Sequence, residues 1–174
     1  PYSVTFSDGV SMVKRTVNNS PWESYHVHSN GGGLVSDGAN VADSVYVGEN
    51  AKVMGNATVS GNVRIEDYAV VQGSATVQDN AVISGYAIIA ENAVVSGNAR
   101  VDDTASVMGR ANVSGNAKVI ESACVYGNTK MTDNAVAKGN AFVMTDAVIS
   151  GQGVVDGDYY DDGNKTVSKG TAYG

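Results

Sequence analysis

The sequence predicts an all-β fold, a triangular parallel β-solenoid with 18 residues in each coil, and three observations support this prediction. Residues 35–154 form 20 consecutive six-residue units without an insertion. Position one of the unit is Val or Ile in 18 cases, and position five is Ala in 16. Position three is Gly in 10 units and Asp or Glu in 9, often followed by Asn. A fixed short period of this kind is the signature of a repeat architecture.

Each unit is expected to contain one short strand and one corner. Side chains alternate along a strand, so position five of one unit and position one of the next face inward, while the residue between them faces out. Gly, Asp and Asn at positions three and four are turn residues. Three corners close a coil of 18 residues, so the 120 residues of 35–154 make six to seven coils. At about 4.8 Å per coil, the solenoid is roughly 30 Å tall.

The two ends of the chain depart from the repeat. Residues 1–34 are expected to form an amino-terminal extension that resembles a β-hairpin, with strands over 2–6 and 10–17 around a turn at Asp8 and Gly9. Residues 35–160 are assigned to the solenoid, and residues 161–174 to a tail that is expected to be either loop or a short final strand at Thr166 and Val167. Because an open solenoid end exposes unpaired strand groups, we expect the extension or the tail to act as a cap.

Composition excludes several classes of partner. The chain of 174 residues carries a net charge of −7, which argues against binding to nucleic acid or to an anionic membrane. It contains no apolar run near the ~18 residues that membrane insertion requires. The single cysteine, Cys124, lies at an outward position without a nearby histidine to activate it, and we interpret it as a small apolar surface residue. Since the chain begins at Pro1 and not at Met, we expect it to be a fragment of a larger protein.

Units such as Val53-Met54-Gly55-Asn56-Ala57-Thr58 resemble the hexapeptide-repeat left-handed parallel β-helix family, over about 120 of the 174 residues. The resemblance implies a left-handed coil. Acyltransferases of that family use a histidine within a coil and often a loop inserted between coils, and gamma-class carbonic anhydrases use three histidines. Here the only histidines, His26 and His28, precede the repeat. We therefore expect a non-catalytic module. The alternatives are an acyltransferase or other carbohydrate-active enzyme using these two histidines, and a purely structural spacer.

A second resemblance concerns the junction between the extension and the repeat. The stretches 13–17 and 22–28, followed by three glycines at 31–33, are similar to the carboxy-terminal region of large secreted bacterial proteins of the avirulence type. This resemblance implies a secreted or cell-surface accessory module, with the chemistry carried by another part of the parent protein.

The same junction holds the first candidate site. Trp22 and Tyr25 are candidates for stacking on a sugar ring. His26 and His28 are spaced to project from one face of a strand and are weak candidates for metal ligands, with Glu23 or Asp37 as a third ligand. The competing interpretation is that the extension simply packs against the solenoid.

Acidic residues at one corner form a second candidate. An 18-residue coil places Glu49 beside Asp67 and Asp103 beside Glu121 in neighbouring coils. We expect no cofactor, but such pairs could bind Ca²⁺ or share a proton. The alternative is that they are solvated turn residues. The Asn-rich corners are expected to form ladders of stacked amides.

One of the three outer faces is largely apolar, and this is the third candidate. It comprises Lys52, Met54, Val70, Gln72, Ile88, Ala90, Ser106, Met108, Cys124, Tyr126, Phe142 and Met144. A long exposed apolar surface normally marks a contact site. We expect it to bind a polysaccharide, a protein, another domain, the chain's own extension or a second copy of the chain. Tyr126, Phe142, Met108 and Met144 are the candidate contact residues. The second face is small and polar, and the third carries mixed charges.

Overall fold

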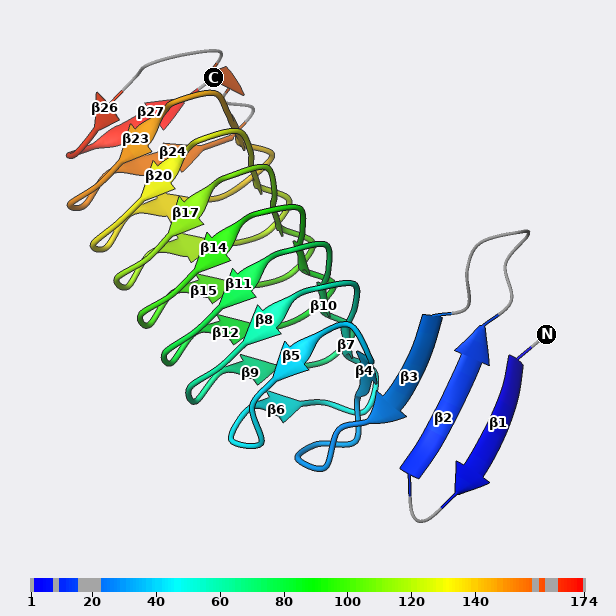
Figure 1. Cartoon of the computed structure of the whole chain (residues 1–174). Helices are drawn as coiled ribbons and strands as arrows, with labels where there is room; N and C mark the ends of the chain where they lie inside the picture. The colour runs from blue at the N-terminus through cyan, green and yellow to red at the C-terminus, as the bar shows by residue number, and fades with distance from the viewer. Residues whose placement is uncertain (1, 8–9, 16–22, 158–159, 162–165, 174) are drawn as a thin grey trace.

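The computed structural model describes residues 2–7, 10–15, 23–157, 160–161 and 166–173. Among these residues every regular element is a β-strand, and the strands form three parallel stacks around a common axis (Figure 1). The predicted all-β triangular solenoid is therefore confirmed, with about seven turns. The described residues contain no helix long and apolar enough to cross a membrane.

The first sheet combines the amino-terminal extension with one side of the solenoid. Its order is β1 (Tyr2–Ser7), β2 (Val10–Arg15), β3 (Glu23–Val27), β4 (Leu34–Ser36), β7 (Lys52–Val53), β10 (Val70–Val71), β13 (Ile88–Ile89), β16 (Ser106–Val107), β19 (Cys124–Val125), β22 (Phe142–Val143) and β25 (Tyr160–Asp161).

The second and third sheets form the other two sides. The second contains β5 (Asn40–Val41), β8 (Thr58–Val59), β11 (Thr76–Val77), β14 (Val94–Val95), β17 (Asn112–Val113), β20 (Lys130–Met131), β23 (Val148–Ile149) and β26 (Thr166–Val167). The third contains β6 (Tyr46–Val47), β9 (Arg64–Ile65), β12 (Val82–Ile83), β15 (Arg100–Val101), β18 (Lys118–Val119), β21 (Val136–Ala137), β24 (Val154–Asp156) and β27 (Thr171–Tyr173).

Strands of neighbouring coils pair at a spacing of three six-residue units, as the period predicts. Val70 pairs with Ile88, and Val71 pairs with Ile89, in parallel. The last turn differs, because Val154 of β24 pairs with Thr171 of β27, one position short of a full coil. At this tightened turn a Cβ on Gly153 would lie 2.3 Å from the Val167 carbonyl oxygen, which explains why glycine replaces the usual alanine at position five.

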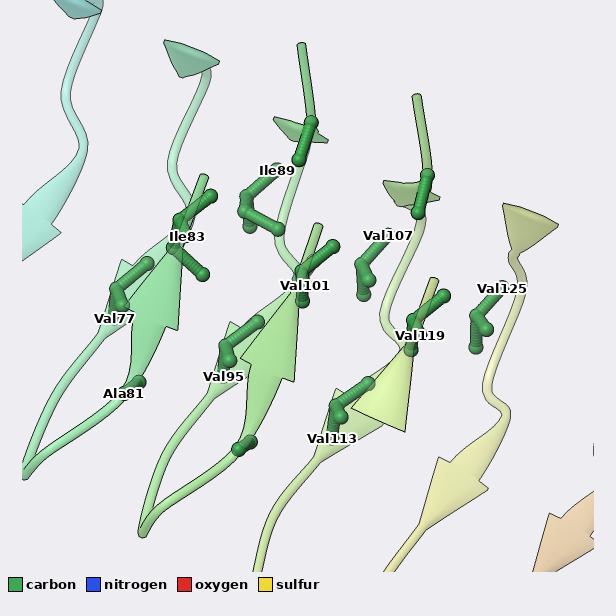
Figure 2. Packing of buried hydrophobic residues seen from close by; sticks show 14 of the residues in the cluster. Val77, Ala81, Ile83, Ile89, Val95, Val101, Val107, Val113, Val119 and Val125 are labelled. Atoms are coloured by element: carbon green, nitrogen blue, oxygen red, sulfur yellow. The ribbon is translucent and has the colours of Figure 1, made fainter. Parts of the chain in front are cut away.

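The core is a column of valine, isoleucine and alanine. Figure 2 shows Val77, Ile83 and Ile89 of one coil repeated by Val95, Val101 and Val107 in the next. The inward residues of the central coils are at most 1% exposed. β-Branched residues fit the pleated sides, and alanine fills the space beside each corner. Thr129, the one polar inward residue of these units, donates its hydroxyl to the Tyr126 carbonyl oxygen at 2.7 Å.

Every corner from Gly55 to Gly151 has the same backbone shape. Position three has a positive φ throughout, not only at glycine but also at six acidic residues and at Thr145. The non-glycine residues are Asp67, Asp79, Glu91, Asp103, Glu121, Asp133 and Thr145, with φ between 54° and 67°. A uniform corner is required because each coil must superimpose on the next for the strands to pair.

The amino-terminal extension continues the first sheet beyond the solenoid. β1 and β2 are antiparallel, which confirms the hairpin-like arrangement, and their connecting turn lies outside the described residues. β3 pairs antiparallel with both β2 and β4. The extension therefore lies at the edge of the first sheet, next to its outer face and not over it (Figure 1).

The tail adds further strands to the other end. Of the two alternatives for Thr166 and Val167, loop or a short strand, the structure has the strand: it is β26, which pairs with β23. β25 and β27 pair with β22 and β24. The three sheets thus continue past residue 160, where the sequence placed the end of the solenoid.

Candidate functional site

The candidate site residues before the repeat differ in how far they are buried. Trp22 lies outside the described residues. Tyr25 on β3 is only 7% exposed, which leaves no ring face open to a sugar, so its predicted stacking role is corrected. His26 is half-buried, and its Nδ1 lies 3.3 Å from Oδ1 of Asp37.

His28 is a structural residue at the base of the solenoid. It is 5% exposed, and its Nε2 lies 2.9 Å from the carbonyl oxygen of Val45. The turn that follows bonds to the same strand, since Gly33 N–H donates to the Val47 carbonyl and Val47 N–H donates to the Asn30 carbonyl. The segment after β3 therefore caps the free edge of β6, in agreement with the predicted role of the extension.

The two weak candidates for metal ligands, His26 and His28, do not share a site. His26 and His28 have different partners, and the side chain of Glu23 lies outside the description. Within the described ranges, no group of three or more His, Cys, Asp and Glu side chains is arranged to hold a metal ion. His26 and Asp37 alone supply two ligands, fewer than a protein zinc site uses.

The corner carboxylates have a structural task that sequence reasoning missed. Asp67 accepts the backbone N–H of Gly85 at 3.0 Å, one coil further on. Asp103 accepts the N–H of Glu121 at 3.0 Å, and Glu121 accepts that of Gly139 at 2.7 Å. Asp79 and Asp133, at another of the three corners of the coil, make the same bond to Gly97 and Gly151. The Asp103 and Glu121 pair thus points its oxygens at backbone donors, an arrangement that differs from the shared calcium site considered above.

Two ladders of side chains run along the corners. Asn62, Asn80, Asn98, Asn116 and Asn134 are linked by amide hydrogen bonds of 3.1–3.3 Å, which confirms the predicted stacked amides. At the corner before the first sheet, the rings of Tyr68 and Tyr86 stack with centroids 5.0 Å apart and an interplanar angle of 5°. The signal for this stack in the sequence is that the two tyrosines are separated by one full coil.

The third sheet carries ion pairs on its outer face. Arg64 binds Glu66 at 2.6 Å and lies over the ring of Tyr46, 4.5 Å from its centroid. Lys138 binds Asp156 at 2.9 Å. These ion pairs agree with the mixed charges that the sequence predicts for this face.

Among the carboxylates described on that sheet, Asp102 accepts the most hydrogen bonds. It accepts hydrogen bonds from Arg100, from Ser84 at 2.7 Å and from the backbone N–H of Asp103 at 2.8 Å. Desolvation is the largest single effect and raises the pKa of Asp102, but the hydrogen bonds and the Arg100 charge together outweigh it. The pKa of this carboxyl therefore lies below its ordinary value.

The exposed apolar surface gathers at the first sheet. Among the residues whose burial the structure describes, the most exposed large hydrophobic residues are Val27, Tyr68, Tyr86, Ile88 and Tyr126, and these five belong to this sheet or to the corners beside it. Met108, Phe142 and Met144 point outward from the same face and are half-buried. Cys124 lies among them, where burial raises the pKa of its thiol although a hydrogen bond with Ser106 opposes the shift. Its raised pKa fits the interpretation as an apolar surface residue.

Two shallow hollows border this face. One, of about 260 Å³, is lined by Tyr126 with Arg110, Glu91 and the amides of Asn92 and Asn128. The other, of about 300 Å³, lies at the opposite corner and is lined by Tyr46, Gly48, Glu49, Asn50, Glu66 and Asp67. Each hollow combines an aromatic ring with several hydrogen-bonding groups.

Comparison with known proteins adds no family to this picture: no protein-family model and no curated protein matches the chain.

We predict that His28→Ala destabilises the solenoid by about 1–3 kcal/mol, because the Val45 carbonyl then loses its partner in a buried position. Equilibrium unfolding in urea measures the change. His26→Ala is the matched control and should alter stability by less than about 0.5 kcal/mol, since its side chain is 38% exposed. Equal effects of the two substitutions would contradict the assignment of His28 to the cap.

We predict that Asp102→Asn weakens the fold at neutral pH by about 0.5–1 kcal/mol and has a diminishing effect below about pH 4. The pKa of Asp102 is lowered on folding, so the carboxylate stabilises the chain above its unfolded pKa. That stabilisation is lost as pH falls through the folded pKa. Urea unfolding of both proteins across the acid range tests this, and a difference that does not change with pH would refute it.

Proposed function

We propose that this chain is a non-catalytic scaffold module of a secreted or surface bacterial protein, of the hexapeptide-repeat left-handed β-helix type, and that the outer face of its first sheet binds a polysaccharide. The observation that carries the proposal is the concentration of exposed apolar side chains on that one face. The other two faces also carry some valines, but small polar residues and charged residues, several of them in ion pairs, predominate there.

The hydrogen-bond partners of the titratable groups favour a scaffold function over a catalytic one. His28 is committed to Val45, and the carboxylates of Asp67, Asp103 and Glu121 are committed to backbone N–H groups. A general base must reach a substrate proton within hydrogen-bond distance. Groups already bound to the frame of the solenoid are poor candidates for that role.

The chemistry beside Tyr126 favours a sugar. Tyr126 is 37% exposed at the border of the face, and the adjoining hollow offers a guanidinium, a carboxylate and two amides. A pyranose ring has apolar C–H faces and a rim of hydroxyl groups. An aromatic ring that carries the apolar face, with polar side chains at its edge, matches both parts of such a ligand.

The shape of the face also suits a polysaccharide. Seven coils at about 4.8 Å each, and about four residues across at 3.3 Å, give a strip roughly 34 Å long and 13 Å wide. A strip of this length and width can accommodate an extended chain of sugar rings.

The test is a glycan array with the intact chain and the variants Tyr126→Ala and Thr132→Ala, the latter an outward residue of the second sheet. We expect linear polysaccharides to bind, with at least about tenfold weaker binding for Tyr126→Ala and no change for Thr132→Ala.

Absence of any glycan bound would contradict the proposal. So would a stable dimer in sedimentation that the substitution Met108→Lys dissociates, because that result assigns the face to self-association.

A further inference from the structure

Tyr68 and Tyr86 form an aromatic stack that the fold itself does not require. Their side chains are 53% and 62% exposed, and the rings are nearly parallel at a spacing close to that of the coils. Each ring covers one face of the other. By the register of the coils, the remaining faces lie over Asn50 on one side and Thr104 on the other, both shorter than a tyrosine. The outer part of each remaining ring face is thus open.

The stack borders the same apolar face as Tyr126, on the opposite side. Tyr68 and Tyr86 precede Val70 and Ile88 by two residues, so alternation turns them to the outer side of the first sheet. Ile88 is itself 38% exposed and continues the apolar surface from the stack into the sheet. The face is consequently bounded by tyrosines at both of its corners.

The two aromatic borders are separated by more than one sugar ring. Tyr126 occupies the position of Ala90 two coils further along, because 90 and 126 differ by twice the register of the coils. From Tyr86 to position 90 is four residues, about 13 Å along the strand, and two coils add about 10 Å across the strands. The direct separation is then about 16 Å, which only a ligand of several linked rings can span.

The charge beside the stack limits the kind of sugar. The hollow next to Asp67 brings together Glu49, Asp67 and Glu66, the last of which is paired with Arg64. The other hollow holds Glu91 and Arg110, so carboxylates outnumber cations over the two hollows, and the chain as a whole carries a net charge of −7. Carboxylates accept hydrogen bonds from hydroxyl groups and repel uronates. A non-acidic chain is therefore favoured over an acidic one.

We propose that Tyr68 with Tyr86 and Tyr126 with its hollow are two anchors for a single non-acidic pyranose chain, which lies obliquely across the outer face of the first sheet. This inference rests on the proposed function and adds the direction, the minimum length and the charge class of the ligand. Two linked anchors raise affinity only when one ligand reaches both. The affinity for an oligosaccharide should therefore rise sharply at the length that first reaches both anchors.

The experiment measures calorimetric binding of oligomers of glucose, mannose, xylose and N-acetylglucosamine, from dimers to octamers, with galacturonate oligomers as the acidic counterpart. The intact chain is compared with the double variant Tyr68→Ala and Tyr86→Ala, and with Tyr126→Ala. Thr58→Ala with Thr76→Ala is the matched control, because these two residues also lie one above the other in neighbouring coils, but on the second sheet and away from both anchors.

We expect the double tyrosine variant to bind long oligomers about tenfold or more weakly and short oligomers unchanged, with the control like the intact chain. Replacement of both tyrosines by phenylalanine should preserve binding, and thermal unfolding should show that all variants fold. Galacturonates should bind more weakly than the neutral oligomers.

The two proposals fail in different ways. If no oligomer binds at any length, both are wrong. If oligomers bind and Tyr126→Ala weakens them, but the double tyrosine variant binds long oligomers as the intact chain does, the polysaccharide-binding face stands and the two-anchor arrangement is refuted.

Discussion

The hydrogen bonds between successive coils are the constraint on which the rest of the structure depends. Most strands of the solenoid contain only two residues, so no strand can be stable without the one above and below it. Stacking requires every corner to repeat the same backbone shape. That shape includes a positive φ at position three, which costs an L-residue roughly 1–2 kcal/mol. Glycine avoids the cost at ten of these corners, and at several others an acidic side chain bonds the backbone of the next coil.

The hydrogen bond from an acidic side chain to the next coil explains why acids can take the place of glycine at some corners. Asp79 and Asp133 occupy one corner column where Gly97 and Gly115 lie between them. Each acid binds the N–H of the glycine or acid one coil further on, so the strain at its own backbone is offset by a bond that holds two coils together. Charge at the corners therefore stabilises the stack. The calcium and proton-sharing interpretations are not required to explain it.

Much of the fold could be predicted because a six-residue period leaves few alternatives. Val71 and Ile89 face inward, and they pair at the spacing that the period dictates. The six-residue period does not predict where the chain departs from the repeat. The shortened last turn at Gly153 depends on how the tail closes, and the burial of His28 depends on a turn that precedes the repeat. Both are contacts between segments that follow different patterns.

The candidate site was predictable in part for the same reason. The apolar face follows from alternation, so Tyr126 and Met108 could be placed on it from the sequence, whereas the burial of Tyr25 could not. The stack of Tyr68 and Tyr86 was readable only as a pair separated by one coil, because neither corner is unusual alone. Because the interior of the solenoid is filled, a ligand can be recognised only by side chains on its surface, which are stacked in columns at the spacing of the coils.

The most direct test of this account is the removal of one complete coil. Deletion of residues 90–107 takes out three six-residue units and joins two positions that are equivalent in the repeat. We expect a cooperatively folded β-protein with a urea m-value reduced in proportion to the lost surface. Deletion of residues 90–98, half as many, should prevent folding, because an odd shift turns inward valines to the solvent. Loss of folding in the first variant, or equal stability of both, would contradict the coil as the structural unit.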